Sequence, residues 1–292
     1  MSDSKIIIIG GATASGKSSL AVKLALDKDA VIINADSMQL YKELPIITAQ
    51  PTAQEQQVIS HKLYGTIQAS EHCSVAKWIN LARIEINEAL AANKTPILVG
   101  GTGMYIKSLI DGLSEIPDIS DEIKQFSTKL MEKIGAEEFH KKLSEIDPII
   151  ANRLPTSDRQ RMIRAYNVHQ QTGITLSDWQ KKPNKIFYPK ESFKGIFLNI
   201  EREKLYDNCN KRFLKMLDEG ALREVEQLMK QNLNPNLPAC KALGVPEITT
   251  YLTGEYEKEE MIEKAQTATR QYAKRQLTWF KNQFADWEVV DS

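Results

Sequence analysis

The sequence predicts an α/β protein whose core is a parallel sheet flanked by helices, with an all-helical domain inserted into it. Three short apolar runs, at residues 6–9, 30–35 and 96–101, have the length and aliphatic content of buried strands. Helical spacing of apolar residues follows them, as in residues 75–90 after the predicted Ser74 cap. Strands that alternate with helices favour a parallel sheet with right-handed crossovers. The residues that follow each strand are then the first candidates for a site.

The insertion is predicted from a change of pattern. Composition changes at about Pro117, and from there to about Pro189 only helices are indicated, with the second half of the interval basic. Strand signals return at residues 193–200. We therefore expect a core domain of residues 1–116 and 190–292, and a helical insertion domain of residues 117–189 that moves relative to the core. Further elements are expected as helices at 121–134, 136–144, 158–172, 202–219, 222–231 and 257–284, a turn around 238–246 and a last edge strand at 289–290.

Composition limits the class of protein. The 292 residues carry 38 Lys and Arg against 38 Asp and Glu, and 42% are hydrophobic, as in ordinary globular proteins. No apolar run approaches the ~20 residues of a membrane helix, and the chain enters its first strand too early for a signal peptide. The three cysteines form no metal-type pair. We expect a cytoplasmic protein without a membrane partner, and a monomer; zero net charge does not exclude a nucleic-acid partner, because local clustering decides that.

The strongest motif follows the first strand. Residues 11–18, GATASGKS, fit the pattern G-x-x-x-x-G-K-[ST] of nucleotide- and ATP-binding loops, with a strand before and an amphipathic helix after. Such a loop points successive N–H groups at an anionic phosphate at a helix N-terminus. The sequence therefore predicts a P-loop NTPase-like core that binds a diphosphate or nucleotide. The predicted binding residues are Gly11, Ala12, Thr13, Ala14, Ser15, Gly16, Lys17 and Ser18, with Lys17 on the outer oxygens and Ser18 on Mg²⁺.

A carboxylate follows the second predicted strand. Asp36 would lie at the same sheet edge as Thr13 and Thr102. From position alone Asp36 could help to hold Mg²⁺, accept a proton from a substrate, or merely cap the following turn.

Eight segments, taken together, resemble the tRNA dimethylallyltransferase family over nearly the entire chain, with the short ending of its bacterial members. They are GATASGKS, ADSMQLY (35–41), TAQPT (48–52), LVGGTGMYIKSL (98–109), DRQRMIRA (158–165), NKRFLKMLDEGALREV (210–225), ALGVPEI (242–248) and ATRQYAKRQLTWF (268–280).

The resemblance implies transfer of a dimethylallyl group from dimethylallyl diphosphate to a tRNA. The acceptor would be the exocyclic amine of the adenosine just 3′ of the anticodon, in tRNAs that read codons beginning with U. By resemblance Asp36 is the general base, Thr13 lies close to the reacting centre, and Arg212 helps to hold the diphosphate. Without the resemblance, Arg212 would be one charge on an amphipathic helix.

The resemblance also implies residues that contact the tRNA anticodon stem-loop. Two Arg residues spaced three apart on a helix share a face suited to phosphates. Lys124 stands where some relatives have an arginine, which keeps the charge but loses bidentate geometry. The implied contacts are Asp36, Ser37, Met38, Gln39, Thr102, Lys124, Gln160, Arg161, Met162, Ile163 and Arg164.

Three other functions fit parts of the pattern. A small-molecule or nucleotide kinase would use the same loop with ATP. An adenylate isopentenyltransferase would use AMP as acceptor, although a mononucleotide needs no basic insertion. A non-catalytic RNA-binding protein would leave Asp36 and Arg212 without a role.

Overall fold

The computed structural model describes residues 5–291 and divides the chain into two compact units. The core unit contains Met1–Ile110 and Tyr188–Ser292, and the insertion unit contains Asp111–Phe187. We expected the insertion to span 117–189. It begins earlier because the segment that enters the insertion pairs with the segment that leaves it. Leu113 N–H donates to Lys185 O, and Lys185 N–H donates to Leu113 O.

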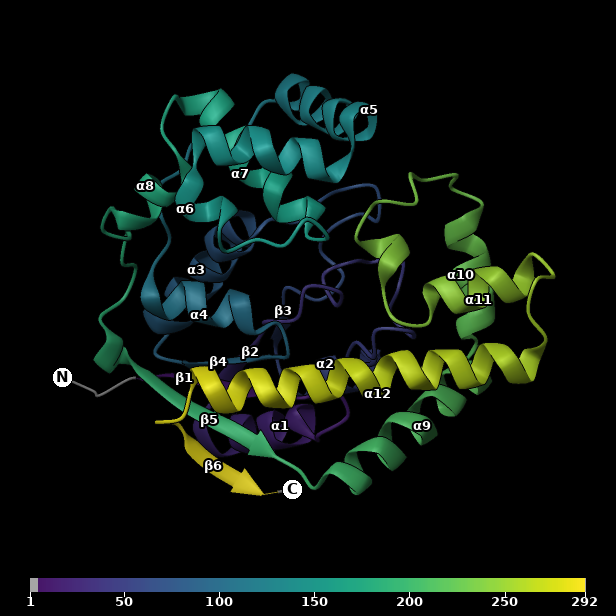
Figure 1. Cartoon of the computed structure of the whole chain (residues 1–292). Coiled ribbons are helices and arrows are strands. Elements are labelled where there is room, and N and C mark those ends of the chain that lie inside the picture. The colour runs from purple at the N-terminus through teal and green to yellow at the C-terminus, as the bar shows by residue number, and fades with distance from the viewer. Residues whose placement is uncertain (1–4, 292) are drawn as a thin grey trace. The chain divides into compact units, whose positions relative to one another are not determined.

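A six-stranded parallel sheet forms the centre of the core unit (Figure 1), in the order β3-β2-β4-β1-β5-β6. The four predicted inner strands and the predicted edge strand are all present. The short β3 was not predicted, because two residues carry no periodic signal. The strands are β1 (Ile6–Gly11), β2 (Ala30–Asn34), β3 (His61–Lys62), β4 (Thr95–Gly100), β5 (Phe193–Asn199) and β6 (Glu288–Asp291).

Both faces of this sheet are covered, which explains why its inner strands are mostly apolar. Ile7 and Ile9 pack against α1 (Lys17–Lys28), where Ala21 and Ala25 allow a close approach. Helix α3 (Val75–Ala91) packs against β2 and β4 on the other face (Figure 1), and the predicted Ser74 cap accepts the Lys77 N–H.

The remaining core helices carry much of the site. Helix α9 matches the predicted bounds, and the long α12 packs against both β1 and α9. The turn expected around 238–246 is partly wrong: α11 begins at Val245, because a proline in the first turn starts a helix instead of ending one. The helices are α2 (Ala53–Val58), α4 (Gly103–Asp111), α9 (Arg202–Glu219), α10 (Ala221–Met229), α11 (Val245–Leu252) and α12 (Lys258–Gln283), with short 3₁₀ turns at Lys190–Ser192 and Ala239–Lys241.

The insertion unit is built from four helices around its own apolar cluster, which includes Phe139, Leu143 and Met162. The two helices expected at 121–134 and 136–144 are both present and share the label α5, because they meet at Gly135, where the backbone leaves the helical conformation (φ 79°, ψ 167°). The others are α6 (Pro148–Ala151), α7 (Arg159–Thr172) and α8 (Leu176–Lys181), with α5 spanning Asp121–Ile146.

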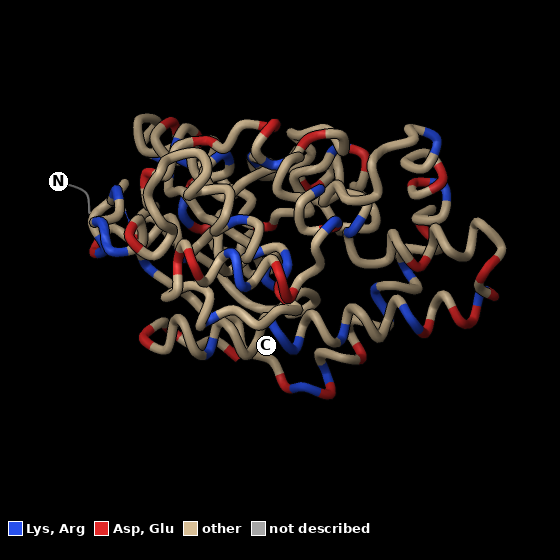
Figure 2. Tube along the Cα trace, turned by 45° about the horizontal axis from the view of Figure 1, so that its top comes forward, with Lys and Arg blue, Asp and Glu red and all other residues tan. Residues whose placement is uncertain are grey.

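Charges of both signs are interspersed along most of the chain (Figure 2), while residues 153–194 carry nine Lys and Arg against three Asp and Glu. Within residues 5–291, no helix combines the length and apolar character needed to cross a membrane.

Candidate functional site

The loop between β1 and α1 has the geometry of a phosphate-binding loop. Gly16 (φ 94°) and Ala14 (φ 60°) take left-handed backbone conformations that curl the chain, and Asn208 Nδ2 donates to Ala14 O at 3.2 Å. Helix α1 begins at Lys17 with no side-chain cap. The N–H groups of its first turn therefore have no side-chain acceptor. They lie at the N-terminus of the helix, which attracts anions.

Lys17 is folded back onto this loop, with Nζ 2.5 Å from Ala12 O. Burial lowers the pKa of Lys17 to about 8, while nearby Asp36 opposes that shift and Arg212 adds to it. An anion that reached the ammonium would replace a neutral carbonyl with a charged partner.

Thr13 is held by both of its polar groups. Its Oγ1 accepts a hydrogen bond from Arg212 Nη2 at 2.5 Å, and its backbone N–H donates to Gln276 Oε1 at 2.8 Å. Arg212 is half-buried, and burial lowers its pKa. The structure thus brings Arg212 of α9 to the phosphate loop, which its place in the sequence alone could not predict.

Asp36 is fixed by the residues around it. Its backbone N–H donates to Asn34 Oδ1 at 2.7 Å, and its carbonyl accepts from Asn34 Nδ2 at 2.9 Å. Its Oδ1 accepts the Met38 N–H at 3.0 Å. Asp36 therefore does cap the following turn, but this role occupies only Oδ1 and leaves the role of Oδ2 open.

The next predicted contacts are also brought to this edge. Ser37 N–H donates to Thr102 Oγ1 at 2.9 Å, which joins the ends of β2 and β4. Gln39 Nε2 donates to Thr48 O at 2.9 Å and Ala49 O at 2.7 Å. The amide N–H groups of Gln39 thus hold a neighbouring loop, so a contact of Gln39 with tRNA would have to use Oε1.

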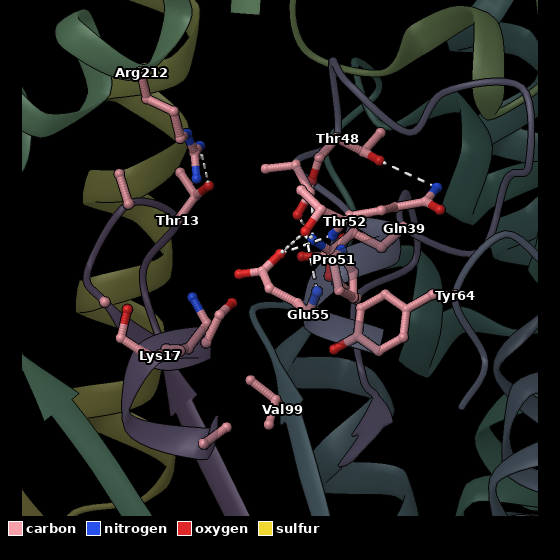
Figure 3. A pocket seen from close by; sticks show the side chains of 18 of the residues that line it. Thr13, Lys17, Gln39, Thr48, Pro51, Thr52, Glu55, Tyr64, Val99 and Arg212 are labelled. Carbon is pink, nitrogen blue, oxygen red and sulfur yellow. Dashed lines mark hydrogen bonds between the residues drawn. The ribbon is translucent and has the colours of Figure 1, made fainter. Parts of the chain in front are cut away.

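Two adjoining cavities open at this edge of the core unit. The larger, about 1310 Å³, has the phosphate loop and α9 on one side and residues 48–56 with Tyr64 on the other (Figure 3). The smaller, about 320 Å³, is lined by Met38, Phe213 and Tyr272 among others. Both are lined by Thr13, Asp36, Thr48, Arg212 and Met216.

The predicted contacts in the insertion unit divide into two groups. Gln160, Arg161, Arg164 and Lys124 are exposed. Met162 is fully buried in the cluster of this unit, and Ile163 packs partly against it. The Met162 side chain therefore packs in the core of this unit and is not exposed for a contact with tRNA, as is common for an apolar residue inside a motif.

Ser18 lines the larger cavity in the first turn of α1 and could supply one hydroxyl ligand to Mg²⁺. Among residues 5–291, no group of three or more His, Cys, Asp or Glu side chains could hold a metal ion. Mg²⁺ usually takes few protein ligands and is held largely by substrate phosphates and water.

Sequence reasoning assigned no specific contact to three residues that position the site. They are the buried Asn34, Gln276 between two strand ends, and Glu224, whose carboxylate accepts the N–H groups of Ile46 and Ile47 at 2.8 Å each. Asn34 could have been found, because it is a polar residue at the end of a buried apolar run. Glu224 and Gln276 could not, because the sequence shows only that each lies on a predicted helix.

A parallel sheet whose first strand leads through such a loop into a helix defines a P-loop NTPase-like core. A model of the IPP transferase family matches residues 39–283. The chain belongs to this family.

Full-length relatives also cover the phosphate loop, which precedes the matched residues. A tRNA dimethylallyltransferase of Rickettsia bellii (strain OSU 85-389) is 44% identical over 100% of this chain and 92% of its own. One from Wolbachia pipientis wMel is 45% identical over 98% and 95%.

Solved structures show the same fold. A tRNA isopentenylpyrophosphate transferase from Bacillus halodurans has a TM-score of 0.70 at 33% identity, over 99% of this chain and 90% of its own. A eukaryotic dimethylallyltransferase acting on tRNA has a TM-score of 0.86 at 29% identity, over 98% and 73%.

Proposed function

We propose that this chain transfers a dimethylallyl group from dimethylallyl diphosphate to tRNA. The acceptor is the exocyclic amine of the adenosine immediately 3′ of the anticodon, in tRNAs that read codons beginning with U. One observation carries the proposal: Thr13, Asp36 and Arg212 line both cavities, so a donor in one and an acceptor in the other would meet beside them.

The donor diphosphate binds on the phosphate-loop side of the larger cavity. The uncapped first turn of α1 supplies N–H donors, and Lys17 and Arg212 supply positive charge. These groups stabilise the charge that develops on the leaving diphosphate.

The acceptor adenine enters the smaller cavity. An unpaired base beside the anticodon costs little to turn out of its stack, and aromatic side chains such as Phe213 and Tyr272 give it flat apolar surfaces. Asp36 at the junction then faces the exocyclic amine.

The transfer is a substitution at carbon. The amine nitrogen forms a bond to C1 of the dimethylallyl group, the C1–O bond to the diphosphate breaks, and its electron pair leaves with the diphosphate. The amine proton passes to the Asp36 carboxylate, which is needed because an aromatic amine is a poor nucleophile. Because Oδ1 accepts the Met38 N–H, we assign proton acceptance to Oδ2.

Mg²⁺ would be bound by the Ser18 hydroxyl and the diphosphate oxygens. When bound, it would neutralise charge on the diphosphate. The exposed Arg161 and Arg164 of the insertion unit would contact tRNA phosphates.

The test is incubation with labelled dimethylallyl diphosphate and Mg²⁺, with unmodified tRNA or AMP as acceptor, followed by nucleoside analysis. We expect label on adenosine of tRNAs whose anticodon ends in adenosine, and none on AMP. Label on AMP alone would indicate a mononucleotide prenyltransferase. No label on either acceptor, with ATP consumed in a parallel incubation that contains ATP, would indicate a kinase.

A further inference from the structure

We propose that Gln276 is a positioning residue of the transfer site. Its side chain joins the donor-binding loop, at Thr13, to the residues that follow β4, at Gly101. The inference rests on the proposed function for its catalytic meaning, but its structural part concerns phosphate binding alone. Gln276 itself lines neither cavity. It acts through Thr13.

The side chain of Gln276 uses both ends of its amide. Oε1 accepts the Thr13 N–H at 2.8 Å, and Nε2 donates to Gly101 O at 2.9 Å. Gln276 is only 5% exposed. An unpaired polar group at such a buried position is destabilising, so both bonds matter.

The backbone around Gln276 leaves room for this approach. A Cβ on Gly101 would lie 2.1 Å from Gln276 Nε2, and one on Gly103 would lie 2.0 Å from the ring of Trp279 on the same helix. The glycines after β4 therefore let this face of α12 reach the sheet edge. The carboxylate of Asp36 borders the same space, with Oδ2 at 3.4 Å from the added Gly101 Cβ.

These contacts link the two sides of the site. Thr13, held at its N–H by Gln276, presents Oγ1 to Arg212, which lines the larger cavity. Gly101 precedes Thr102, which bonds to Ser37 directly after Asp36. One neutral amide thus fixes the donor-binding loop relative to the proton acceptor. Gln276 also occupies the Thr13 N–H, which removes that group from the donors available to the diphosphate.

The decisive variant is Gln276→Met, because methionine has a similar length and packs well but can make neither bond. Gln266→Met is the matched control. Gln266 lies on the same helix, is half-buried and donates to Asn210 O at 3.3 Å, away from the phosphate loop. Measurements are the affinity for inorganic diphosphate with Mg²⁺, the affinity for tRNA, the kinetic constants for prenyl transfer, and the thermal midpoint.

We expect Gln276→Met to weaken diphosphate binding about tenfold and to lower kcat by about 10- to 100-fold, since misplacement by ~1 Å can cost 10²-fold. Affinity for tRNA should match that of Gln266→Met. The thermal midpoint of Gln276→Met should be the lower of the two, because this variant leaves the Thr13 N–H without its acceptor and removes the Gln276 donor from the Gly101 carbonyl, so binding and kinetics are measured well below both midpoints.

Equal diphosphate affinity and kcat in the two variants would overturn the proposal. So would a loss in Gln276→Met fully accounted for by a lower thermal midpoint. If the unaltered protein binds diphosphate but transfers no prenyl group, the proposed function fails, while the diphosphate affinities still test the role of Gln276 in the loop.

Discussion

The core unit and the insertion unit carry their predicted site residues in different ways. In the core, Thr13, Asp36 and Arg212 come from distant segments and are held by hydrogen bonds to fixed partners. In the insertion, Arg161 and Arg164 project from the exposed side of α7, one helical turn apart, and Arg161 makes an ion pair with the neighbouring cap Asp158 at 3.2 Å. A site for bond chemistry needs the first kind of construction, because small displacements are costly. A phosphate-binding surface tolerates the second, because its contacts are mainly electrostatic.

Asp36→Ala should have the largest effect on the core side of this comparison. Loss of the proton acceptor should lower kcat by about 10²–10⁴-fold with little change in tRNA affinity. Asp36→Asn is the control, because its amide oxygen can still cap the Met38 N–H. If Asp36→Asn restores transfer, the carboxylate serves only as a cap.

The pH dependence of diphosphate binding should sharpen the role of Lys17. Because burial lowers its pKa to about 8, Lys17 is charged below that pH and loses its proton above it. Affinity for inorganic diphosphate should therefore fall about tenfold between pH 7 and pH 9. Lys17→Arg should remove this dependence, since arginine stays charged. The same fall in Lys17→Arg would assign the titration to the diphosphate or to another group.

Met162→Ala should change the stability of the insertion unit and not its chemistry. Removing a fully buried side chain should cost about 2–5 kcal/mol in the free energy of unfolding, measured by urea denaturation. At temperatures where the variant is folded, tRNA affinity should be preserved. A specific loss of tRNA affinity in the folded variant would restore Met162 as a contact.

Arg161→Ala combined with Arg164→Ala should have the smallest effect. If each arginine contacts one phosphate, the slope of log Kd for tRNA against log salt should decrease by about 2, with kcat unchanged. Lys133→Ala, an exposed charge on α5 of the same unit, serves as the comparison. An unchanged slope would remove these arginines from the tRNA surface.

The predictability of the molecule follows the same division. The parallel sheet and most helices could be predicted, because β-branched runs, Ser74, Asp158 and Gly173 leave local signals. The phosphate loop and Asp36 each follow a parallel strand, so their position at the same edge of the sheet could also be predicted. The bridges made by Gln276, Glu224 and Arg212 could not, because they join residues between 175 and 263 positions apart. Within 160–164, the motif could not separate the exposed arginines from the buried Met162.

The most direct test measures tRNA affinity and the single-turnover rate of prenyl transfer for two variants under the same conditions. One is Asp36→Asn, and the other is Arg161→Ala with Arg164→Ala. We predict that the core variant loses rate at saturating tRNA and keeps its affinity, and that the insertion variant loses affinity and keeps its rate. Loss of tRNA affinity in Asp36→Asn equal to its loss of rate would contradict the assignment of bond chemistry to the core site.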